Sequence, residues 1–220
     1  MLKAQTRRTT TKRTARPRLP KIVSLFSGAG GLDHGFKAAG FELSAAFDVS
    51  EAAIETHKYN FPGAVATAGD LIDLGPAGVS AVVGAAIARG SRIGIIGGPP
   101  CQGFSRANTT ATAADPRNKL PKLYIDIVRE LQNDFVVDFV VFENVLGMRD
   151  RKHAAAYQNL LAGLTDLGFD ITEKELCALD FGVPQTRRRI VLSAVRSGLE
   201  AKSVKPRRRK GLSTVRDAIG

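Results

Sequence analysis

The sequence predicts a doubly wound α/β fold built on a mostly parallel sheet. Short apolar runs alternate with amphipathic stretches from Ile22 to Ala194, the pattern of strands that alternate with crossover helices. The run 136–142 is almost continuously β-branched or aromatic, as is typical of a central parallel strand buried on both faces. A glycine-rich turn at 27–31 separates the first apolar run from a helical pattern, and such turns bring backbone N–H groups and a helix start toward a ligand.

Four strands and three helices are expected in the first half of the chain. Each strand is a short apolar run, and the helices show helical spacing of apolar residues or a high alanine content. Gly40 is placed to end the first helix, and Pro62 and Gly63 to end the second. The strands are expected at 22–26, 43–47, 64–66 and 93–96, and the helices at 32–39, 51–60 and 79–89.

Two helices and three strands are expected in the second half, after a long polar segment. Residues 106–118 are rich in Ala, Thr, Asn and Asp without an apolar period. A loop of that length inside a compact domain is usually functional or disordered. The helices are expected at 120–131 and 154–167, and the strands at 136–142, 171–176 and 190–194.

The composition fits a globular protein of one domain. Of the 220 residues, 44% are hydrophobic, which is enough for a sizeable core. No apolar stretch approaches the roughly 18 residues of a membrane span, and no signal-peptide pattern opens the chain. The two cysteines and three scattered histidines give no disulfide framework and no metal-ligand spacing, so we expect a reducing, cytoplasmic location and no metal. We interpret His34, His57 and His153 as ordinary surface or helix residues.

Basic residues are concentrated in two short segments. The net charge is +11, yet residues 1–20 carry seven Lys or Arg without an acid, and residues 201–210 carry six without an acid. Without these thirteen residues the net charge is −2, so the globular body is near neutral. The segments are either solvated, disordered tails or electrostatic tethers to nucleic-acid phosphates. The acid-free start also weakly resembles an organellar transit peptide.

A free cysteine lies where an apolar strand is expected to end. The segment Gly97-Gly98-Pro99-Pro100-Cys101 follows the run 93–96, and open sheets place their chemistry at the carboxyl ends of parallel strands. A free cysteine is most often a buried apolar residue, which is our interpretation of Cys177. At Cys101 the two prolines fix the backbone just before the sulfur, which favours a positioned side chain with a function.

Five motifs, in order along the chain, resemble those of the cytosine-5 DNA methyltransferases. They are Phe-Ser-Gly-Ala-Gly-Gly at 26–31, Pro-Pro-Cys-Gln-Gly-Phe-Ser at 99–105, Leu-Tyr-Ile-Asp at 123–126, Glu-Asn-Val at 143–145, and Gln-Thr-Arg-Arg-Arg at 185–189. The resemblance spans roughly residues 21–195 and implies a Rossmann-like fold that uses S-adenosylmethionine. It divides the chain into a disordered basic tail (1–20), a catalytic domain (21–196), and a basic linker with the start of a truncated or split C-terminal region (197–220).

The resemblance implies a role for each matching residue. The catalytic residues would be Cys101, Glu143, Arg187 and Arg189. S-adenosylmethionine would be held by Phe26, Gly28, Ala29, Gly30, Gly31, Asp48, Val49, Asp70, Leu71, Pro100 and Leu123. DNA would be contacted by Gln102, Ser105, Arg106, Asn144 and Gln185.

Two acidic residues of this set, Asp48 and Asp70, need separate comment. Asp48 ends the second expected strand, where the family usually has a glutamate that binds the ribose hydroxyls, so its side chain is one methylene shorter. In the family the residue matching Asp70 contacts the adenine amino group, and the next apolar residue lines the adenine pocket. Asp70 is alternatively a turn residue or a helix N-cap, because Gly-Asp precedes an apolar stretch.

The implied reaction explains why these residue types are needed. Carbon 5 of cytosine is a poor nucleophile, but addition of the Cys101 thiolate to carbon 6 turns the ring into an enamine that attacks the methyl sulfonium. Arg187 and Arg189 would supply positive charge near the sulfur and the cytosine carbonyl, and Glu143 would hold ring nitrogen 3 and the exocyclic amine. A base inside a duplex cannot be reached, so the target would be flipped out.

Several interpretations stay open. The leading one is the catalytic half of a split DNA methyltransferase of prokaryotic or phage origin, as in restriction–modification. A second polypeptide would carry the target-recognition domain and the C-terminal motifs with which the family continues. A truncated gene or an expression fragment would explain the same sequence. A tRNA cytosine-5 methyltransferase, or a non-catalytic subunit that binds cofactor or a partner, are the alternatives in function.

Overall fold

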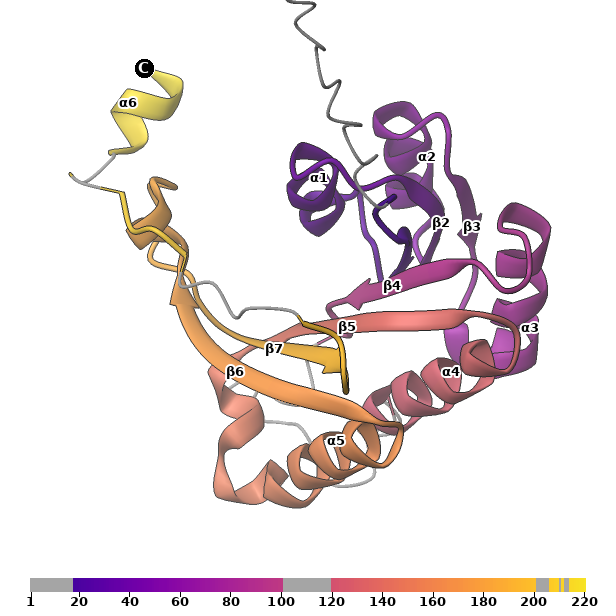
Figure 1. Ribbon diagram of the computed structural model, residues 1–220. Helices are drawn as coiled ribbons and strands as arrows, with labels where there is room; N and C mark the ends of the chain where they lie inside the picture. The colour runs from indigo at the N-terminus through magenta and orange to yellow at the C-terminus, as the bar shows by residue number, and fades with distance from the viewer. Residues whose placement is uncertain (1–17, 101–119, 201–205, 210, 212–213) are drawn as a thin grey trace, which may run out of the picture.

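A seven-stranded sheet forms the centre of the molecule, with strands in the order β3-β2-β1-β4-β5-β7-β6 (Figure 1). The computed structural model describes residues 18–100, 120–200, 206–209, 211 and 214–220. Residues 1–17 of the predicted tail (1–20) and the predicted loop at 106–118 therefore lie outside the described residues. The strands are β1 (Lys21–Leu25), β2 (Leu43–Asp48), β3 (Val65–Ala68), β4 (Arg92–Gly97), β5 (Val136–Asn144), β6 (Phe169–Cys177) and β7 (Arg188–Arg196).

The prediction of a mostly parallel sheet is confirmed. β1 pairs in parallel with β2 and β4, and the β2–β3 and β4–β5 pairs are also parallel. β7 lies between β5 and β6 and is antiparallel to both. The short connection from β6 to β7 explains this reversal, because a parallel pair needs a crossover of a dozen or more residues. The carboxyl ends of β1, β4 and β5 consequently meet at one edge of the sheet.

Helices cover both faces of the sheet, as expected for a doubly wound fold (Figure 1). α1 and α2 lie on one face, and α3, α4 and α5 on the other. Short 3₁₀ turns, η2 (Leu146–Arg149), η3 (Arg151–His153) and η4 (Ala178–Phe181), follow β5 and β6. The helices are α1 (Gly31–Ala38), α2 (Glu51–Asn60), α3 (Leu71–Ala86), α4 (Leu120–Asp134), α5 (Ala154–Asp166) and α6 (Val215–Ile219).

The prediction for α3 is wrong at its start. The helix was expected at 79–89, but helical backbone begins at Leu71 and is kinked where Gly75 adopts φ 62° and ψ 173°. Gly75 and Pro76 read as a loop in the sequence, since both disfavour a helix interior. Asp70 caps the first turn by accepting a hydrogen bond from the Ile72 N–H at 2.8 Å. This bond stabilises the helical turn that precedes the kink at Gly75.

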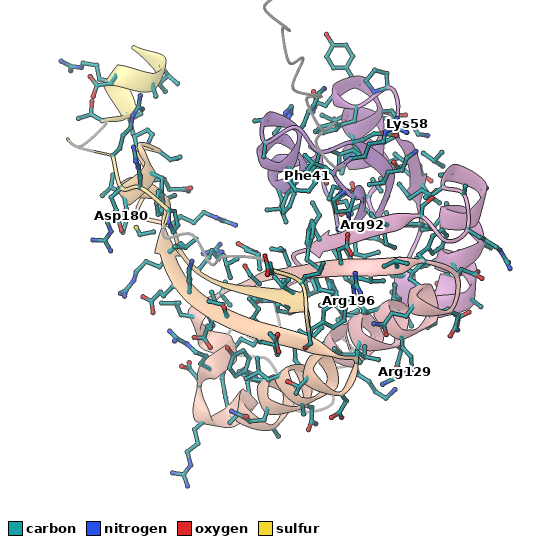
Figure 2. The ribbon with its side chains drawn as sticks, in the orientation of Figure 1. Phe41, Lys58, Arg92, Arg129, Asp180 and Arg196 are labelled. Carbon is teal, nitrogen blue, oxygen red and sulfur yellow. The ribbon has the colours of Figure 1, made fainter. Side chains whose placement is uncertain are left out.

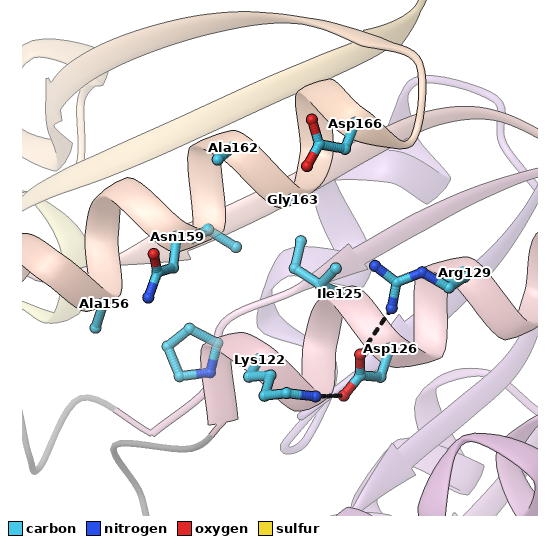
Figure 3. Close-up of a pocket in the computed structure, with 11 residues that line it drawn as sticks. Lys122, Ile125, Asp126, Arg129, Ala156, Asn159, Ala162, Gly163 and Asp166 are labelled. Carbon is cyan, nitrogen blue, oxygen red and sulfur yellow. Dashed lines mark hydrogen bonds and ion pairs between the residues drawn. The ribbon is translucent and has the colours of Figure 1, made fainter.

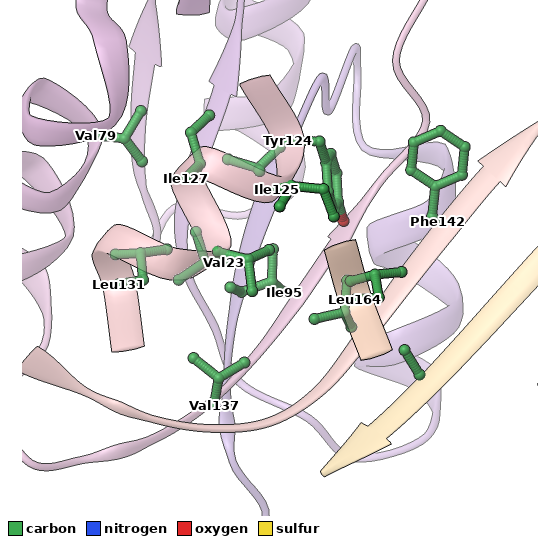
Figure 4. Close-up of a cluster of buried hydrophobic side chains, with 14 of the residues drawn as sticks. Val23, Val79, Ile95, Tyr124, Ile125, Ile127, Leu131, Val137, Phe142 and Leu164 are labelled. Atoms are coloured by element: carbon green, nitrogen blue, oxygen red, sulfur yellow. The ribbon is translucent and has the colours of Figure 1, made fainter. Parts of the chain in front are cut away.

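Alternating residues of the central strands supply two separate cores. Val23, Ile95 and Val137 point toward α3, α4 and α5 and join the larger cluster, drawn in Figure 4. Ile22 and Ile96, their neighbours along the chain, belong to the smaller cluster on the α1 face. This period of two is the consequence of strand geometry, and burial of both faces explains the continuous apolar runs.

Tyr124 of α4 lies at the centre of the larger core. Its ring is fully buried and contacts Phe142 edge-on, with 5.3 Å between the ring centroids. Its hydroxyl donates a hydrogen bond to the Val141 carbonyl at 3.1 Å. Burial raises the pKa of this hydroxyl, so the phenol stays neutral and α4 is held on β5 near its carboxyl end.

A buried carboxylate lies at the opposite end of β5. Asp138 is 2% exposed and sits at an irregularity in the β4–β5 register. Its two oxygens contact the Arg92 Nε at 2.6 Å and an Arg196 terminal nitrogen at 3.1 Å. Figure 2 labels both arginines, which come from the start of β4 and the end of β7. The sequence analysis assigned no role to this group, and its distance from the carboxyl edge indicates a structural one.

The described C-terminal residues lie against the far end of the β6–β7 pair. The Arg209 N–H donates to the Asp180 carbonyl at 2.8 Å, and Arg208 lies 3.5 Å from the Asp180 carboxylate. α6 follows as a short helix with a capping box formed by Thr214 and Asp217. Within the described part of the chain, no helix has the length and apolarity needed to cross a membrane.

Candidate active site

A cavity opens at the carboxyl ends of β1, β4 and β5. Its volume is about 480 Å³, and its lining comes from the turn 26–32 together with Gly98, Glu143 and Arg187. The glycine-rich turn after β1 and the acid at the end of β5 are more than 110 residues apart in the sequence, and the parallel sheet brings them into one cavity. This is the edge at which open α/β sheets bind ligands.

The turn after β1 has the backbone geometry of a ligand cradle. Phe26 has φ 56° and Gly28 φ 54°, and a left-handed conformation at a phenylalanine is uncommon and concentrated at functional sites. A Cβ atom built on Gly28 or Gly31 would meet no atom within 4 Å, so both glycines face open space. The turn therefore leaves room for a ligand directly against its backbone.

Gly30 faces the other side of this turn. It is buried and does not line the cavity, and a Cβ atom there would lie 2.3 Å from the Phe61 ring. The missing side chain makes room for Phe61 behind the turn, and the predicted cofactor contact of Gly30 stays a prediction.

Asp48 is placed at the turn, although its carboxylate already has partners. One oxygen accepts a hydrogen bond from the Gly28 N–H at 2.8 Å and the other from the Ser50 N–H at 2.9 Å. A carboxylate has further lone pairs, so these bonds leave capacity for a ribose hydroxyl. Val49 follows as a 65% exposed apolar side chain at the same edge, where a flat apolar ring could cover it.

The residues after β3 differ from their predicted roles. The Asp70 side chain acts as the N-cap of α3, which was the alternative interpretation. Leu71 is 2% exposed and belongs to the core, so it offers little surface to an adenine ring. The exposed apolar side chain at this position is Ile72, at 46%. Leu71 points inward because it is the first residue of α3, a helix start that the sequence analysis placed later.

Glu143 sits between two arginines at the end of β5. Its Oε1 lies 3.0 Å from the Arg189 Nε and 3.7 Å from a terminal nitrogen of Arg187. The Glu143 side chain is 27% exposed, and its Oε2 lies close to Gly98, where a Cβ atom would be only 2.9 Å away. The three predicted catalytic residues that the structure describes are therefore together, next to the segment that leads to Cys101.

Arg188 points away from this group. It contacts Glu175 of the adjacent strand β6, while Arg187 and Arg189 face Glu143. The predicted pattern of a glutamine and two alternate arginines thus corresponds to the alternation of side chains along an extended segment. Gln185 lies in the exposed turn before β7, where its carbonyl accepts from the Arg187 N–H at 2.9 Å.

An ion-pair network supports the outer face of this strand pair. Arg149 of η2 reaches Glu173 at 2.8 Å and Glu175 at 2.7 Å, and Arg188 shares Glu175. The hydrogen bond from Arg149 lowers the pKa of Glu175, and the neighbouring arginines act in the same direction. Burial and the hydrogen bond to Glu173 raise the pKa of Tyr157, so that hydroxyl remains a donor. The network joins η2, α5 and β6 behind the catalytic group.

The prediction that Asn144 contacts DNA is corrected. Asn144 is 1% exposed, and its amide nitrogen donates to the Pro99 carbonyl at 3.2 Å. Its amide oxygen accepts from the Val145 N–H at 2.9 Å. The side chain is therefore used to fasten the end of β5 to the segment before Cys101.

Some of the remaining predicted site residues lie within the described part of the chain, and others lie outside it. Pro100 is half-buried just beyond β4, and Leu123 is half-buried on α4 against the larger core. Cys177 is half-buried at the end of β6. Cys101, Gln102, Ser105 and Arg106 lie outside the described residues. In the described ranges, no three His, Cys, Asp or Glu side chains are grouped as a metal would require.

Sequence reasoning missed residues that hold the site from behind. Gly98 makes room for the Glu143 carboxylate, and Asn60 donates a hydrogen bond to the Ala29 carbonyl at 3.0 Å. His57, expected at the surface or in a helix, lies in α2 and is completely buried. The signal available in the sequence was the tight Asn-Phe-Pro-Gly end of the second helix, which keeps Asn60 and Phe61 near the turn.

A second cavity, of about 460 Å³, lies between α4 and α5 (Figure 3). Asp126 lines it and is held by Lys122 at 2.5 Å and by Arg129 at 2.8 Å. None of the predicted site residues lines this cavity, and its charged groups are paired along one helix. The cavity at the carboxyl edge is the better candidate, because it combines a glycine turn with converging charged groups.

The comparison with known families agrees with this geometry. The model of the C-5 cytosine-specific DNA methylase family matches residues 20–218. This chain belongs to that family. S-adenosylmethionine is the cofactor that the family implies, and Gly28 and Gly31, which face open space at a helix start, fit its amino-acid end.

Curated relatives of this methylase chain are Type II methyltransferases. It is 37% identical over 209 residues to M.XorII of Xanthomonas oryzae pv. oryzae, covering 91% of this chain and 46% of that protein. It is 39% identical over 197 residues to M.NgoPII of Neisseria gonorrhoeae, covering 90% and 53%. The chain thus spans about half the length of the curated relatives it matches.

Solved structures of similar fold lead to the same family. A protein assigned as a DNA modification methyltransferase encoded within an E. coli prophage superposes with a TM-score of 0.76 at 30% identity, covering 91% of this chain and 54% of that one. DNMT2 of Spodoptera frugiperda gives a TM-score of 0.63 at 28% identity, covering 89% and 55%. The doubly wound fold with an antiparallel β7 is therefore shared with methyltransferases.

Proposed function

We propose that this chain carries the catalytic region of a DNA cytosine-5 methyltransferase. The observation that supports the proposal most directly is the cavity in which Glu143, Arg187 and the glycine-rich turn meet. The turn offers room for a cofactor, and the Glu143–Arg189 group offers hydrogen bonds to a planar base. A methyl group and a base carbon held at one strand edge are what this transfer requires.

Bound S-adenosylmethionine would supply an electrophilic methyl group on a sulfonium. Gly28 and Gly31 would lie against its amino-acid end, Asp48 would accept from its ribose, and Val49 with Ile72 would cover its adenine ring. This set replaces the predicted Leu71 by Ile72, since Leu71 is in the core. Each of these residues lies at the carboxyl ends of β1, β2 and β3.

The chain's own residues would carry the chemistry on the base. The Cys101 thiolate would form a bond to carbon 6 of a flipped cytosine, and Glu143 would hold ring nitrogen 3 and the exocyclic amine. Arg187 and Arg189 would stabilise the negative charge that develops on the ring, with Arg189 also orienting Glu143 at 3.0 Å. After methyl transfer, loss of the carbon 5 proton would release the thiolate and restore the aromatic ring.

DNA-sequence choice would reside in a region that the relatives have and this chain does not match. The Type II relatives are about twice as long as the matched part. We propose that a second polypeptide supplies the region of the relatives that this chain does not match. DNA would be contacted by Gln102, Ser105, Arg106 and Gln185, and its phosphates by the basic segments 1–20 and 201–210.

Trapping of the covalent adduct tests the proposal. With DNA that carries 5-fluorocytosine, the fluorine blocks the final elimination, so the chain and S-adenosylmethionine should give an adduct resistant to denaturation. Cys101→Ser should abolish the adduct, whereas Cys177→Ser, the matched control at the end of β6, should leave it intact. An adduct that persists in Cys101→Ser would refute the assignment of Cys101 as the nucleophile. An adduct that forms with tRNA and not with DNA would show that the substrate is tRNA.

A further inference from the structure

The last turn of α2 lies directly behind the glycine-rich turn. Asn60 donates to the Ala29 carbonyl at 3.0 Å, and the Phe61 ring occupies the space that a side chain on Gly30 would need. One turn earlier in α2, the His57 Nε2 lies 3.5 Å from an Asp33 carboxylate oxygen in the first turn of α1. These contacts join α2 to both ends of the turn that faces the cavity.

Asp33 and His57 form a buried polar pair. Both side chains are 0% exposed, and the 3.5 Å between the His57 Nε2 and the Asp33 carboxylate oxygen is longer than an ordinary hydrogen bond. Their side-chain nitrogens and oxygens have no hydrogen-bond partner within the described residues, so each depends on the other. Burying a polar pair costs folding free energy, and an apolar pair of the same size would often be at least as stable.

The surroundings of His57 fix its ring in place. The ring lies 4.6 Å from the Phe61 ring, which is itself covered by His34 at 4.7 Å and by the Lys37 ammonium at 5.0 Å. Lys37 also donates to the Asn60 carbonyl at 3.2 Å. A movement of His57 would therefore be transmitted to Phe61 and from there to Gly30, since interiors are close-packed.

We propose that His57 is a positioning residue for the cofactor site: through Asp33 and Phe61 it holds the start of α1 and the turn Gly28–Gly31 in the conformation that receives S-adenosylmethionine. The inference rests on the proposed function and extends it to residues that touch no reacting atom. A polar pair fits this role because it fixes one register between two helices, whereas an apolar contact tolerates sliding.

The test compares two histidines that both pack on Phe61. His57→Phe removes the partner of Asp33 and keeps a ring, and His34→Phe is the matched control because His34 is exposed. In the full chain, His57→Phe should weaken S-adenosylmethionine binding in isothermal titration about tenfold. Hydrogen exchange of the amides at 26–33, measured without cofactor, should accelerate by a similar factor. His34→Phe should leave both within about twofold.

A double variant separates positioning from general stability. Asp33→Leu combined with His57→Phe removes both members of the buried polar pair, so the unfolding midpoint should return toward that of the unaltered chain. The weakened cofactor binding and the faster exchange should persist in this variant. Recovery of binding and exchange along with stability would overturn the inference, as would an unchanged affinity in His57→Phe. If the unaltered chain fails to bind S-adenosylmethionine, the proposed function fails instead, and the exchange measurement still decides the positioning role.

Discussion

Three consecutive arginines at 187–189 have different surroundings in the structure. Arg187 and Arg189 face Glu143, at 3.7 Å and 3.0 Å, whereas Arg188 contacts Glu175 on the neighbouring strand. All three are guanidinium side chains, so what distinguishes them is their direction and their partners. Extended backbone sends successive side chains to opposite sides, so one basic run supplies two arginines that face Glu143 and one that faces Glu175.

Arg189 and Arg188 therefore make a matched pair for substitution. Arg189→Ala should reduce methyl transfer by about 100-fold, because it removes a charge next to the developing anion and the partner that orients Glu143. Arg188→Ala should leave methyl transfer within about threefold, since an exposed pair contributes little. Incorporation of labelled methyl groups into DNA measures both rates. Equal losses in the two variants would contradict the assignment by direction.

At the level of residues, the sequence predicted chemical type better than exposure. The glutamine–arginine pattern at 185–189 came from the family resemblance, and the direction of Arg187 and Arg189 toward Glu143 follows from strand alternation, which is a local property. Asn144 and Leu71 were misplaced because their burial depends on tertiary contacts, with Pro99 and with the core below α3. The Asp33–His57 pair joins two helices, and no local sequence pattern predicts such a contact.

At the level of elements, β5 carries a carboxylate at each end in contrasting surroundings. Asp138 is almost fully buried between Arg92 and Arg196 at the amino end, while Glu143 is 27% exposed between Arg187 and Arg189 at the carboxyl end. Both acids lie between two arginines, so the pairing alone does not distinguish a structural group from a catalytic one. The two acids are distinguished by their position, because Glu143 lines the cavity and Asp138 does not.

Amide substitutions at the two ends should have opposite effects. Asp138→Asn should lower the free energy of unfolding by about 2 kcal/mol, because two arginines lose a buried partner, and should leave the turnover of folded molecules unchanged. Glu143→Gln should keep the free energy of unfolding and reduce turnover by at least about 100-fold. Urea unfolding and labelled methyl transfer measure the two quantities. Loss of turnover in folded Asp138→Asn would contradict the structural role.

The element boundaries show where sequence patterns fail. Strands were predicted within a few residues, except that β5, β6 and β7 extend further than their apolar runs. β6 begins two residues before and ends one residue after its predicted range of 171–176, and within that range Glu173 and Glu175 pair with Arg149. The first turn of α3 was missed because Gly75 and Pro76 break the helical pattern, while the cap at Asp70 restores a helix start.

At the level of the whole molecule, apolar side chains remain exposed at the candidate site and on α6. Val49 and Ile72 lie 65% and 46% exposed at the carboxyl edge of the sheet, and Val215 and Ile219 of α6 are 57% and 83% exposed. Single exposed apolar residues are ordinary, but these gather on elements that border the cavity or follow the described basic segment 206–209. We expect cofactor to cover the first pair and protein to cover the second in the active assembly.

Methyl transfer by the 220-residue chain alone should accordingly be slow and without sequence preference. Glu143 and Arg187 line the cavity, whereas under the proposed function the region by which Type II relatives exceed this chain would choose the DNA sequence. Labelled S-adenosylmethionine is incubated with DNA of mixed sequence, with tRNA as a parallel substrate, before and after addition of a second polypeptide that corresponds to that region. Faster methylation confined to one DNA sequence is expected in the mixture. Robust, sequence-specific methylation by the chain alone would refute the need for a second polypeptide, and methylation of tRNA instead of DNA would replace the proposed substrate.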